Sequence, residues 1–223
     1  MTGSTLEAPT PVSPFDLDHW LAQREANHGL TVVELGHGSR PLAEVQHFTD
    51  GRAYVGIEAG LSSFFYGGVA RQVIARLREN RPDENIFFFE QAVDPQTRTA
   101  DDARTILPNG AASEVFLRNV LSDKAVYTSV VEVAKILGEA SRLTEPGGSL
   151  VISETITPYD PVEVRRMAEE VGLVFGDLIG PKDSGWDRLQ DIYLGETSML
   201  DREHPQGHSY YMILSKPYQI TDH

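Results

Sequence analysis

The stretch from Thr31 to Glu58 constrains the fold more than any other part of this 223-residue chain. A short β-branched run at residues 31–35 meets a glycine turn, and a second apolar run at 54–57 ends on the acid Glu58. Apolar runs this short, bounded by glycine, are typical of buried parallel strands. Residues 42–48 leave room for a brief crossover helix. The stretch therefore predicts one half of a nucleoside-binding α/β sheet.

The glycines and the acid of this stretch indicate how a ligand could be held. Gly36 and Gly38 have no Cβ, so a ligand could approach the backbone of the turn closely. The carboxylate of Glu58, about 20 residues further on, could accept the hydroxyl protons of a ribose. A tight structural turn and a solvated strand end would give the same pattern, so both interpretations stay open here.

Strand-like and helix-like segments alternate along the rest of the chain. Helices are expected at 16–28, 69–80, 127–143 and 161–171, and further strands at 86–89, 113–117, 149–154, 173–179 and 210–215. The pattern predicts a Rossmann-like, doubly wound α/β fold with a mostly parallel seven-stranded sheet and helices on both faces. Too little clear helix separates the last two strands, so the last strand is expected to run antiparallel.

A single domain is expected over residues 31–217. Residues 1–14, rich in Thr, Ser and Pro, are expected to be disordered. Residues 15–30 should form an N-terminal helix that either packs on the sheet edge or covers the site. Residues 180–209 show no clear helical or strand period and are predicted to be a substrate-facing insert.

Composition narrows the classes of partner. Acids outnumber bases 33 to 19, giving a formal net charge of −14, whereas phosphate backbones are bound by clustered Lys and Arg. This charge balance therefore disfavours a nucleic-acid partner. No apolar run reaches the ~18 residues of a membrane span, and the start of the chain does not resemble a signal peptide. The chain has no cysteine, so the sequence predicts a cytoplasmic protein without disulfides. No membrane partner is expected, and the acidic charge favours a small-molecule partner. A homodimer stays an open alternative.

Four motifs in order resemble the class I S-adenosylmethionine-dependent methyltransferases, over about residues 31–217. VELGHG at 33–38 is similar to the acid-x-Gly-x-Gly of that family, and YVGIE at 54–58 is like its ribose-binding strand. LTEPGGSLV at 143–151 looks like its helix, Pro-Gly-Gly turn and strand. YYMILSK at 210–216 is similar to its antiparallel last strand.

The resemblance implies an enzyme that transfers a methyl group from S-adenosyl-L-methionine to an oxygen or nitrogen of a small-molecule acceptor, in specialised metabolism, and leaves S-adenosyl-L-homocysteine. Arg40 and Pro41 stand where many members have a third glycine, and Gln91 stands in place of an adenine-contacting acid, with Asp94 as a substitute. An amide oxygen can still bond the adenine amino group. The cofactor-binding residues implied are Glu34, Gly36, His37, Gly38, Glu58, Ala59, Gln91, Ala92 and Asn119.

Histidines in the predicted insert are the candidate catalytic bases. His204 and His208 are favoured, with His37 as a third candidate, because histidine titrates near neutral pH. A lone histidine is more often ordinary surface. The spacing of His204 and His208 would suit a metal pair on a helix, but Pro205 and Gly207 make that helix poor, so no metal is predicted.

Three alternatives to a small-molecule methyltransferase stay open. The Glu58 and Asn85 region is loosely similar to the tRNA guanine-N7 methyltransferases, but their aromatic–proline run after the fourth strand is missing. An NAD-dependent oxidoreductase would need a third glycine where Arg40 stands. A non-catalytic S-adenosylmethionine-fold protein that acts by binding is the third.

Overall fold

The computed structural model describes residues 15–59, 66–91, 104–121, 130–154, 159–193 and 209–218. Its elements in chain order are α1 (Leu17–Ala26), β1 (Thr31–Leu35), the 3₁₀ turn η1 (Leu42–Glu44), β2 (Ala53–Glu58), α2 (Tyr66–Asn80), β3 (Ile86–Glu90), β4 (Ala112–Arg118), α3 (Val130–Leu143), β5 (Thr144–Glu154), α4 (Pro161–Glu170), β6 (Val174–Ile179), α5 (Trp186–Tyr193) and β7 (Tyr210–Ser215).

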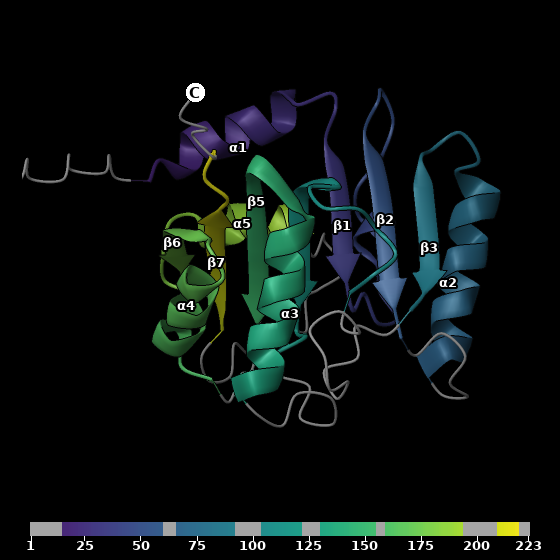
Figure 1. Ribbon diagram of the computed structural model, residues 1–223. Helices are drawn as coiled ribbons and strands as arrows, with labels where there is room; N and C mark the ends of the chain where they lie inside the picture. Colours follow the sequence, from purple (N-terminus) through teal and green to yellow (C-terminus); the bar gives the residue numbers. More distant parts are fainter. Residues whose placement is uncertain are drawn as a thin grey trace, which may run out of the picture.

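The strands form one seven-stranded sheet in the order β3–β2–β1–β4–β5–β7–β6 (Figure 1). Strands β1 to β5 pair in parallel, and β7 runs antiparallel to both β5 and β6. The predicted doubly wound sheet, mostly parallel with an antiparallel last strand, is confirmed.

Strand β1 lies inside the sheet and is covered on both faces. Val32, Val33 and Leu35 are fully buried, as a continuous β-branched run in a parallel strand predicts. Because successive side chains of a strand point to opposite faces, β1 requires a layer of helix on each side. In Figure 1, α3 and α4 lie in front of the sheet and α5 lies behind it.

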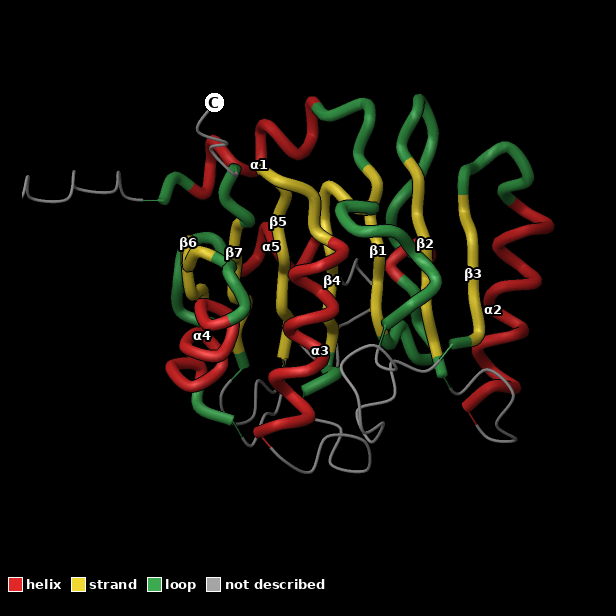
Figure 2. The backbone as a smooth tube through the Cα atoms, viewed as in Figure 1, coloured by secondary structure: helices red, strands yellow, loops and turns green. Residues whose placement is uncertain are grey.

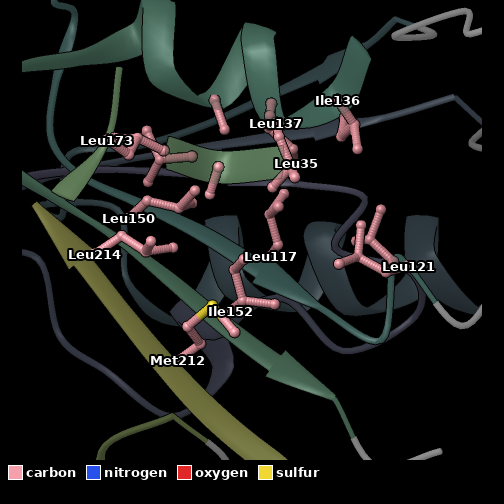
Figure 3. Close-up of a cluster of buried hydrophobic side chains, with 14 of the residues drawn as sticks. Leu35, Leu117, Leu121, Ile136, Leu137, Leu150, Ile152, Leu173, Met212 and Leu214 are labelled. Atoms are coloured by element: carbon pink, nitrogen blue, oxygen red, sulfur yellow. The ribbon is translucent and has the colours of Figure 1, made fainter. Parts of the chain in front are cut away.

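Helices α3 and α4 build the core on one face, with apolar side chains at helical spacing directed at the sheet. Figure 3 shows this cluster, in which the labelled residues are Leu35, Leu117, Leu121, Ile136, Leu137, Leu150, Ile152, Leu173, Met212 and Leu214. The other face is covered by η1, α2 and α5, whose buried residues include Leu42, Val73, Leu77, Trp186, Leu189 and Tyr193. The prediction of helices on both faces is therefore confirmed.

Helix α1 lies at the amino-terminal ends of the strands. The indole nitrogen of Trp20 donates to Ser149 Oγ over 3.0 Å, and the Arg24 guanidinium contacts the buried Glu114 carboxylate at 2.5 Å. Figure 2 shows α1 at the upper ends of the strands, and the arrowhead of β1 in Figure 1 points down, away from α1. In the structure α1 therefore packs against the amino-terminal parts of β4 and β5.

The brief crossover helix expected at residues 42–48 is shorter than predicted. Only the single turn η1 forms. Side-chain nitrogens of Arg81 donate hydrogen bonds to main-chain carbonyl oxygens in this turn and just after it. They donate to the oxygens of Ala43 at 2.7 Å, Gln46 at 3.0 Å and Glu44 at 3.3 Å. Because these acceptors are satisfied by Arg81, the residue that follows α2, the segment needs no longer helix.

The Pro-Gly-Gly sequence predicted as the turn after α3 lies inside strand β5. Ala112 pairs with Thr144, but Glu114 already pairs with Ser149, so the intervening residues of β5 bulge out of register. Gly147 there has a φ of +83°, a backbone conformation that favours glycine. The prediction of a turn outside the strand was wrong, because the motif bends the strand instead of preceding it.

Two further elements differ from expectation. Strand β3 has an apolar sequence, but it is the outermost strand beside β2, and Phe87 is 51% exposed. Helix α5 lies in the segment for which no period was recognised, and it buries Trp186, Leu189 and Tyr193 against the sheet. This part of the predicted insert is therefore core. Residues 194–208 and 1–14 lie outside the described residues.

Among the helices of the described ranges, none combines the length and the apolar character that crossing a bilayer requires.

Candidate functional site

The carboxyl ends of β1 and β4 meet where the strand order of the sheet reverses. β1 pairs with β2 on one side and with β4 on the other, and Leu35 lies opposite Leu117. In open α/β sheets a ligand binds in the crevice outside such a reversal point. The turn that contains Gly36 and Gly38 directly follows β1 and therefore lies at this position.

The two glycines of the turn are required for different reasons. Gly36 has a φ of +71°, and a Cβ there would lie 3.0 Å from a methyl carbon of Val120, so this glycine allows the turn to pack on the chain after β4. Gly38 has a φ of +58°, and a Cβ there would have no heavy atom within 4 Å. Only Gly38 faces open space, so it is the glycine that a ligand could approach.

The acid at the end of β2 reaches the same turn. The amide nitrogen of Gly38 donates to Glu58 Oε2 over 2.8 Å. Glu58 is half-buried, and Ala59, which follows it, is exposed. The structure therefore brings together the glycine turn and the acid that the sequence predicted as partners.

The Glu34 side chain points into the protein and holds the base of the glycine turn in place. Its Oε2 accepts from the Tyr54 hydroxyl at 2.6 Å and from the Leu42 amide at 2.7 Å, and its Oε1 lies 3.5 Å from a guanidinium nitrogen of Arg118. Glu34 is fully buried. Burial and the adjacent Glu34 carboxylate raise the pKa of the Tyr54 phenol well above its usual range. The carboxylate thus joins β1, β2, β4 and the segment after the turn.

His37 is enclosed rather than open at the edge. It is 3% exposed, its ring meets Phe88 edge-on with 5.3 Å between centroids, and Nδ1 lies 2.8 Å from the Gly38 carbonyl oxygen. The absence of a side chain at Gly56 makes room for it, since a Cβ there would lie 2.9 Å from His37 Cδ2. In this conformation the imidazole is placed to support the turn, and a role as base would require it to move.

Gln91 and Asn119 lie at the ends of β3 and β4. The side-chain nitrogen of Gln91 donates to the Arg104 carbonyl at 3.2 Å, and its side-chain oxygen accepts from the Ile106 main-chain nitrogen at 3.0 Å. Both polar atoms of this side chain are therefore bonded to the main chain. Asn119 is exposed and has a φ of +54°, which asparagine tolerates better than most residues. Its main-chain nitrogen donates to the Ser153 carbonyl oxygen over 2.8 Å. Asn119 is therefore held beside the crevice.

The remaining predicted site residues, Ala92, His204 and His208, lie outside the described residues. The contacts that Tyr54 and Arg118 make with Glu34 were not predicted from the sequence. Strand register was the available signal: Val32 lies opposite Tyr54 and Glu34 opposite Gly56, which puts the Tyr54 and Glu34 side chains on the same face of the sheet.

The strand order, the antiparallel last strand and a glycine turn at the reversal point define the Rossmann-like fold of class I S-adenosylmethionine-dependent methyltransferases. No protein-family model matches the chain, and no curated protein matches it.

Solved structures share this fold. An S-adenosylmethionine-dependent methyltransferase from Aquifex aeolicus matches with a TM-score of 0.54 and 14% identity, over 93% of each chain. A putative sarcosine dimethylglycine methyltransferase from Galdieria sulphuraria matches with a TM-score of 0.55 and 12% identity, over 90% of this chain and 85% of that one. The [4+2]-cyclase SpnF matches with a TM-score of 0.53 and 13% identity, over 91% and 80%. At these identities the likeness shows the fold alone.

Proposed function

We propose that this chain binds S-adenosyl-L-methionine beside Gly38 and Glu58 and transfers its methyl group to an oxygen or nitrogen of a small-molecule acceptor, in specialised metabolism. One observation carries the proposal. The open left-handed Gly38 and the Glu58 carboxylate are joined by a hydrogen bond of 2.8 Å at the reversal point of the sheet. This arrangement suits a nucleoside.

The residues present fit the donor. The space at Gly38 that a Cβ would enter is open, and Glu58 offers carboxylate oxygens to ribose hydroxyls. Asn119, exposed at the end of β4, is the candidate for the aminoacyl part. When bound, S-adenosyl-L-methionine supplies an electrophilic methyl group on a positively charged sulfur.

The role of the chain in such a reaction is mainly to position the reactants. Glu34, Tyr54 and Arg118 hold the turn rigidly, which reduces the entropy lost on binding. An attacking oxygen or nitrogen must also lose a proton. His204 and His208 stay the predicted bases for that step.

The net charge of −14 supports a small acceptor over a nucleic acid. The fold itself does not fix the chemistry, since a [4+2]-cyclase shares it. Binding and turnover therefore have to be tested separately.

Calorimetric titration with S-adenosylhomocysteine tests the donor site. The purified protein should bind it with micromolar affinity, and the Glu58→Ala variant should lose at least 10-fold in affinity, while NAD should not bind. Glu169→Gln is the matched control, because Glu169 is an exposed acid on α4 paired with Arg165. Folded protein that binds no S-adenosylhomocysteine would refute the proposal.

A further inference from the structure

A second cleft lies at the amino-terminal ends of the strands, at the opposite edge of the sheet from Gly38 and Glu58. It has a volume of about 500 Å³ and is lined by α1, residues 46–47 after η1, residue 52 before β2, and α5. In Figure 1 this is the upper end of the sheet, where α1 lies, whereas the arrowhead of β1 points down. Pockets that bind small molecules have volumes of about 300–1,000 Å³. The cleft is therefore large enough for a small ligand, and it is separate from the proposed donor site.

The floor of the cleft is a buried, hydrogen-bonded group. Arg24 of α1 donates to both carboxylate oxygens of Glu114 on β4, at 2.5 and 3.1 Å, and to the side-chain oxygen of Gln46 at 2.9 Å. The side-chain nitrogen of Gln46 in turn donates to the carbonyl oxygen of Ile192, in the last turn of α5, over 2.7 Å. Because these bonds join α1, β4 and α5, the floor is held in one shape before a ligand binds.

Arg52 brings to the cleft a positive charge that no carboxylate of the described residues pairs with. Of the other two guanidinium groups that line it, Arg24 is paired at the floor, and Arg188 is paired with Asp18. Arg52 appears in none of the ion pairs found among the described residues. Its Nη2 donates to the main-chain carbonyl oxygen of Glu25, which lies in the last turn of α1. A guanidinium has five N–H hydrogens, so this one bond leaves a pair of parallel N–H groups available to a ligand.

The other side chains of the cleft limit the kind of anion that fits. Buried Leu21 and half-buried Ile192 add apolar surface beside the guanidinium groups. Glu25 and Asp191 are exposed lining residues, and their negative charges would repel a polyanion such as a nucleic acid or a nucleoside triphosphate. The cleft therefore suits a single negative charge attached to an apolar body.

We infer that this cleft binds a small organic carboxylate with an apolar body, whose two oxygens accept hydrogen bonds from Arg52. The planar fork of a guanidinium matches the geometry of a carboxylate, and such charge-assisted pairs are stronger than neutral hydrogen bonds. The apolar body would lie against Leu21 and Ile192. Because the cleft and the crevice at Gly38 are at opposite edges of the sheet, this carboxylate is a separate ligand and not the methyl acceptor.

Calorimetric titration of the full chain with phenylacetate, its uncharged amide phenylacetamide, and inorganic phosphate tests the site. Phenylacetate should bind at least 10-fold more tightly than either of the other two. Arg52→Gln should weaken phenylacetate binding about 10-fold or more, as the loss of hydrogen bonds between charged groups predicts. Arg52→Lys keeps the charge but not the fork, so it should weaken binding about 3-fold. Arg166→Gln is the matched control, because Arg166 is an exposed arginine on α4 paired with Glu170.

A competition experiment shows where the carboxylate binds. A saturating concentration of S-adenosylhomocysteine should leave the affinity for phenylacetate within about 2-fold of its value in the free protein, whereas displacement would place phenylacetate at the donor site and overturn the inference. Equal binding of phenylacetamide, tighter binding of phosphate, equal effects of Arg52→Gln and Arg166→Gln, or no binding of phenylacetate at millimolar concentration by folded protein would overturn it as well. If circular dichroism showed that Arg52→Gln does not fold, Arg52→Lys and the comparison with the amide would decide.

Discussion

The hydroxyl of Tyr54 donates to the carboxylate of Glu34 over 2.6 Å, between two side chains that are fully buried. This hydrogen bond links β2 to β1 directly beneath the glycine turn. A buried carboxylate is costly unless several donors surround it. The Leu42 amide and the Arg118 guanidinium supply the other contacts, so the four groups act as one unit that fixes the turn.

Removal of this hydroxyl should lower both stability and donor affinity. Tyr54→Phe leaves the buried Glu34 carboxylate with one donor fewer, which we expect to lower the free energy of unfolding by about 2 kcal/mol. The loosened turn should weaken S-adenosylhomocysteine binding about 3-fold or more. Urea unfolding and calorimetry measure the two effects. Tyr218→Phe is the control, because Tyr218 is 76% exposed, and equal effects of the two substitutions would contradict this account.

Three glycine substitutions separate backbone strain from loss of the binding space. Gly38→Ala and Gly172→Ala both place a side chain at a positive φ with no heavy atom near the new Cβ, so each should cost about 1 kcal/mol of stability. Only Gly38→Ala should weaken S-adenosylhomocysteine binding, by at least 10-fold. Gly36→Ala should destabilise most, because its Cβ would also meet Val120 at 3.0 Å.

Thermal unfolding and calorimetry of these variants, side by side, provide the test. If Gly172→Ala weakened binding as much as Gly38→Ala does, strain alone would account for the loss and the open space at Gly38 would have no special role.

The contact between α1 and β4 should affect stability without affecting the site. Arg24→Met would leave the Glu114 side chain, which is 2% exposed, buried without its cation, at a cost of roughly 3–5 kcal/mol. S-adenosylhomocysteine affinity should be unchanged, because this contact lies at the amino-terminal edge of the sheet. The double variant Arg24→Met with Glu114→Leu should recover most of the stability. A loss of affinity in folded Arg24→Met would contradict the placement of α1.

Buried tyrosines should make the fold sensitive to alkali. The pKa values of Tyr54, Tyr193 and Tyr210 are all raised, first by burial and then by nearby carboxylates. Above about pH 10 the unfolded chain therefore loses phenol protons that the folded chain keeps, so the free energy of unfolding falls as pH rises. Below pH 10 this contribution is fully present.

Absorbance at 295 nm during an alkaline titration follows the phenolate, and far-ultraviolet circular dichroism follows the fold. We expect these three tyrosines to ionise in the same pH range in which helix is lost. Tyr193→Phe, which removes one buried phenol and keeps the ring, should shift this alkaline unfolding to higher pH. Ionisation of all tyrosines before any loss of helix would contradict the burial.

The parts of the fold that follow from local pattern were predictable. The run at residues 31–35, its glycine turn and the strand ending in Glu58 have short-range signals, and the structure pairs them in parallel as expected. α5 also had a signal that was missed: Trp186, Leu189 and Tyr193 are spaced i, i+3 and i+7, which fits one helix face.

Side-chain direction was not predictable from local pattern. Glu34 was expected to bind the cofactor, yet it turns toward Tyr54 and Arg118, whose positions depend on strands distant in sequence. Gln91 was expected at the adenine, but both ends of its amide bind the backbone of residues 104 and 106. Such contacts depend on tertiary neighbours that no short window contains.

A crystal structure of the full chain with S-adenosylhomocysteine bound would show whether the ligand lies at Gly38 and Glu58. The account predicts the ribose hydroxyls within hydrogen-bond distance of the Glu58 carboxylate and the ligand in contact with the backbone at Gly38, with Glu34 still bonded to Tyr54. A ligand bound elsewhere on the chain, with Glu58 and Gly38 untouched, would contradict it.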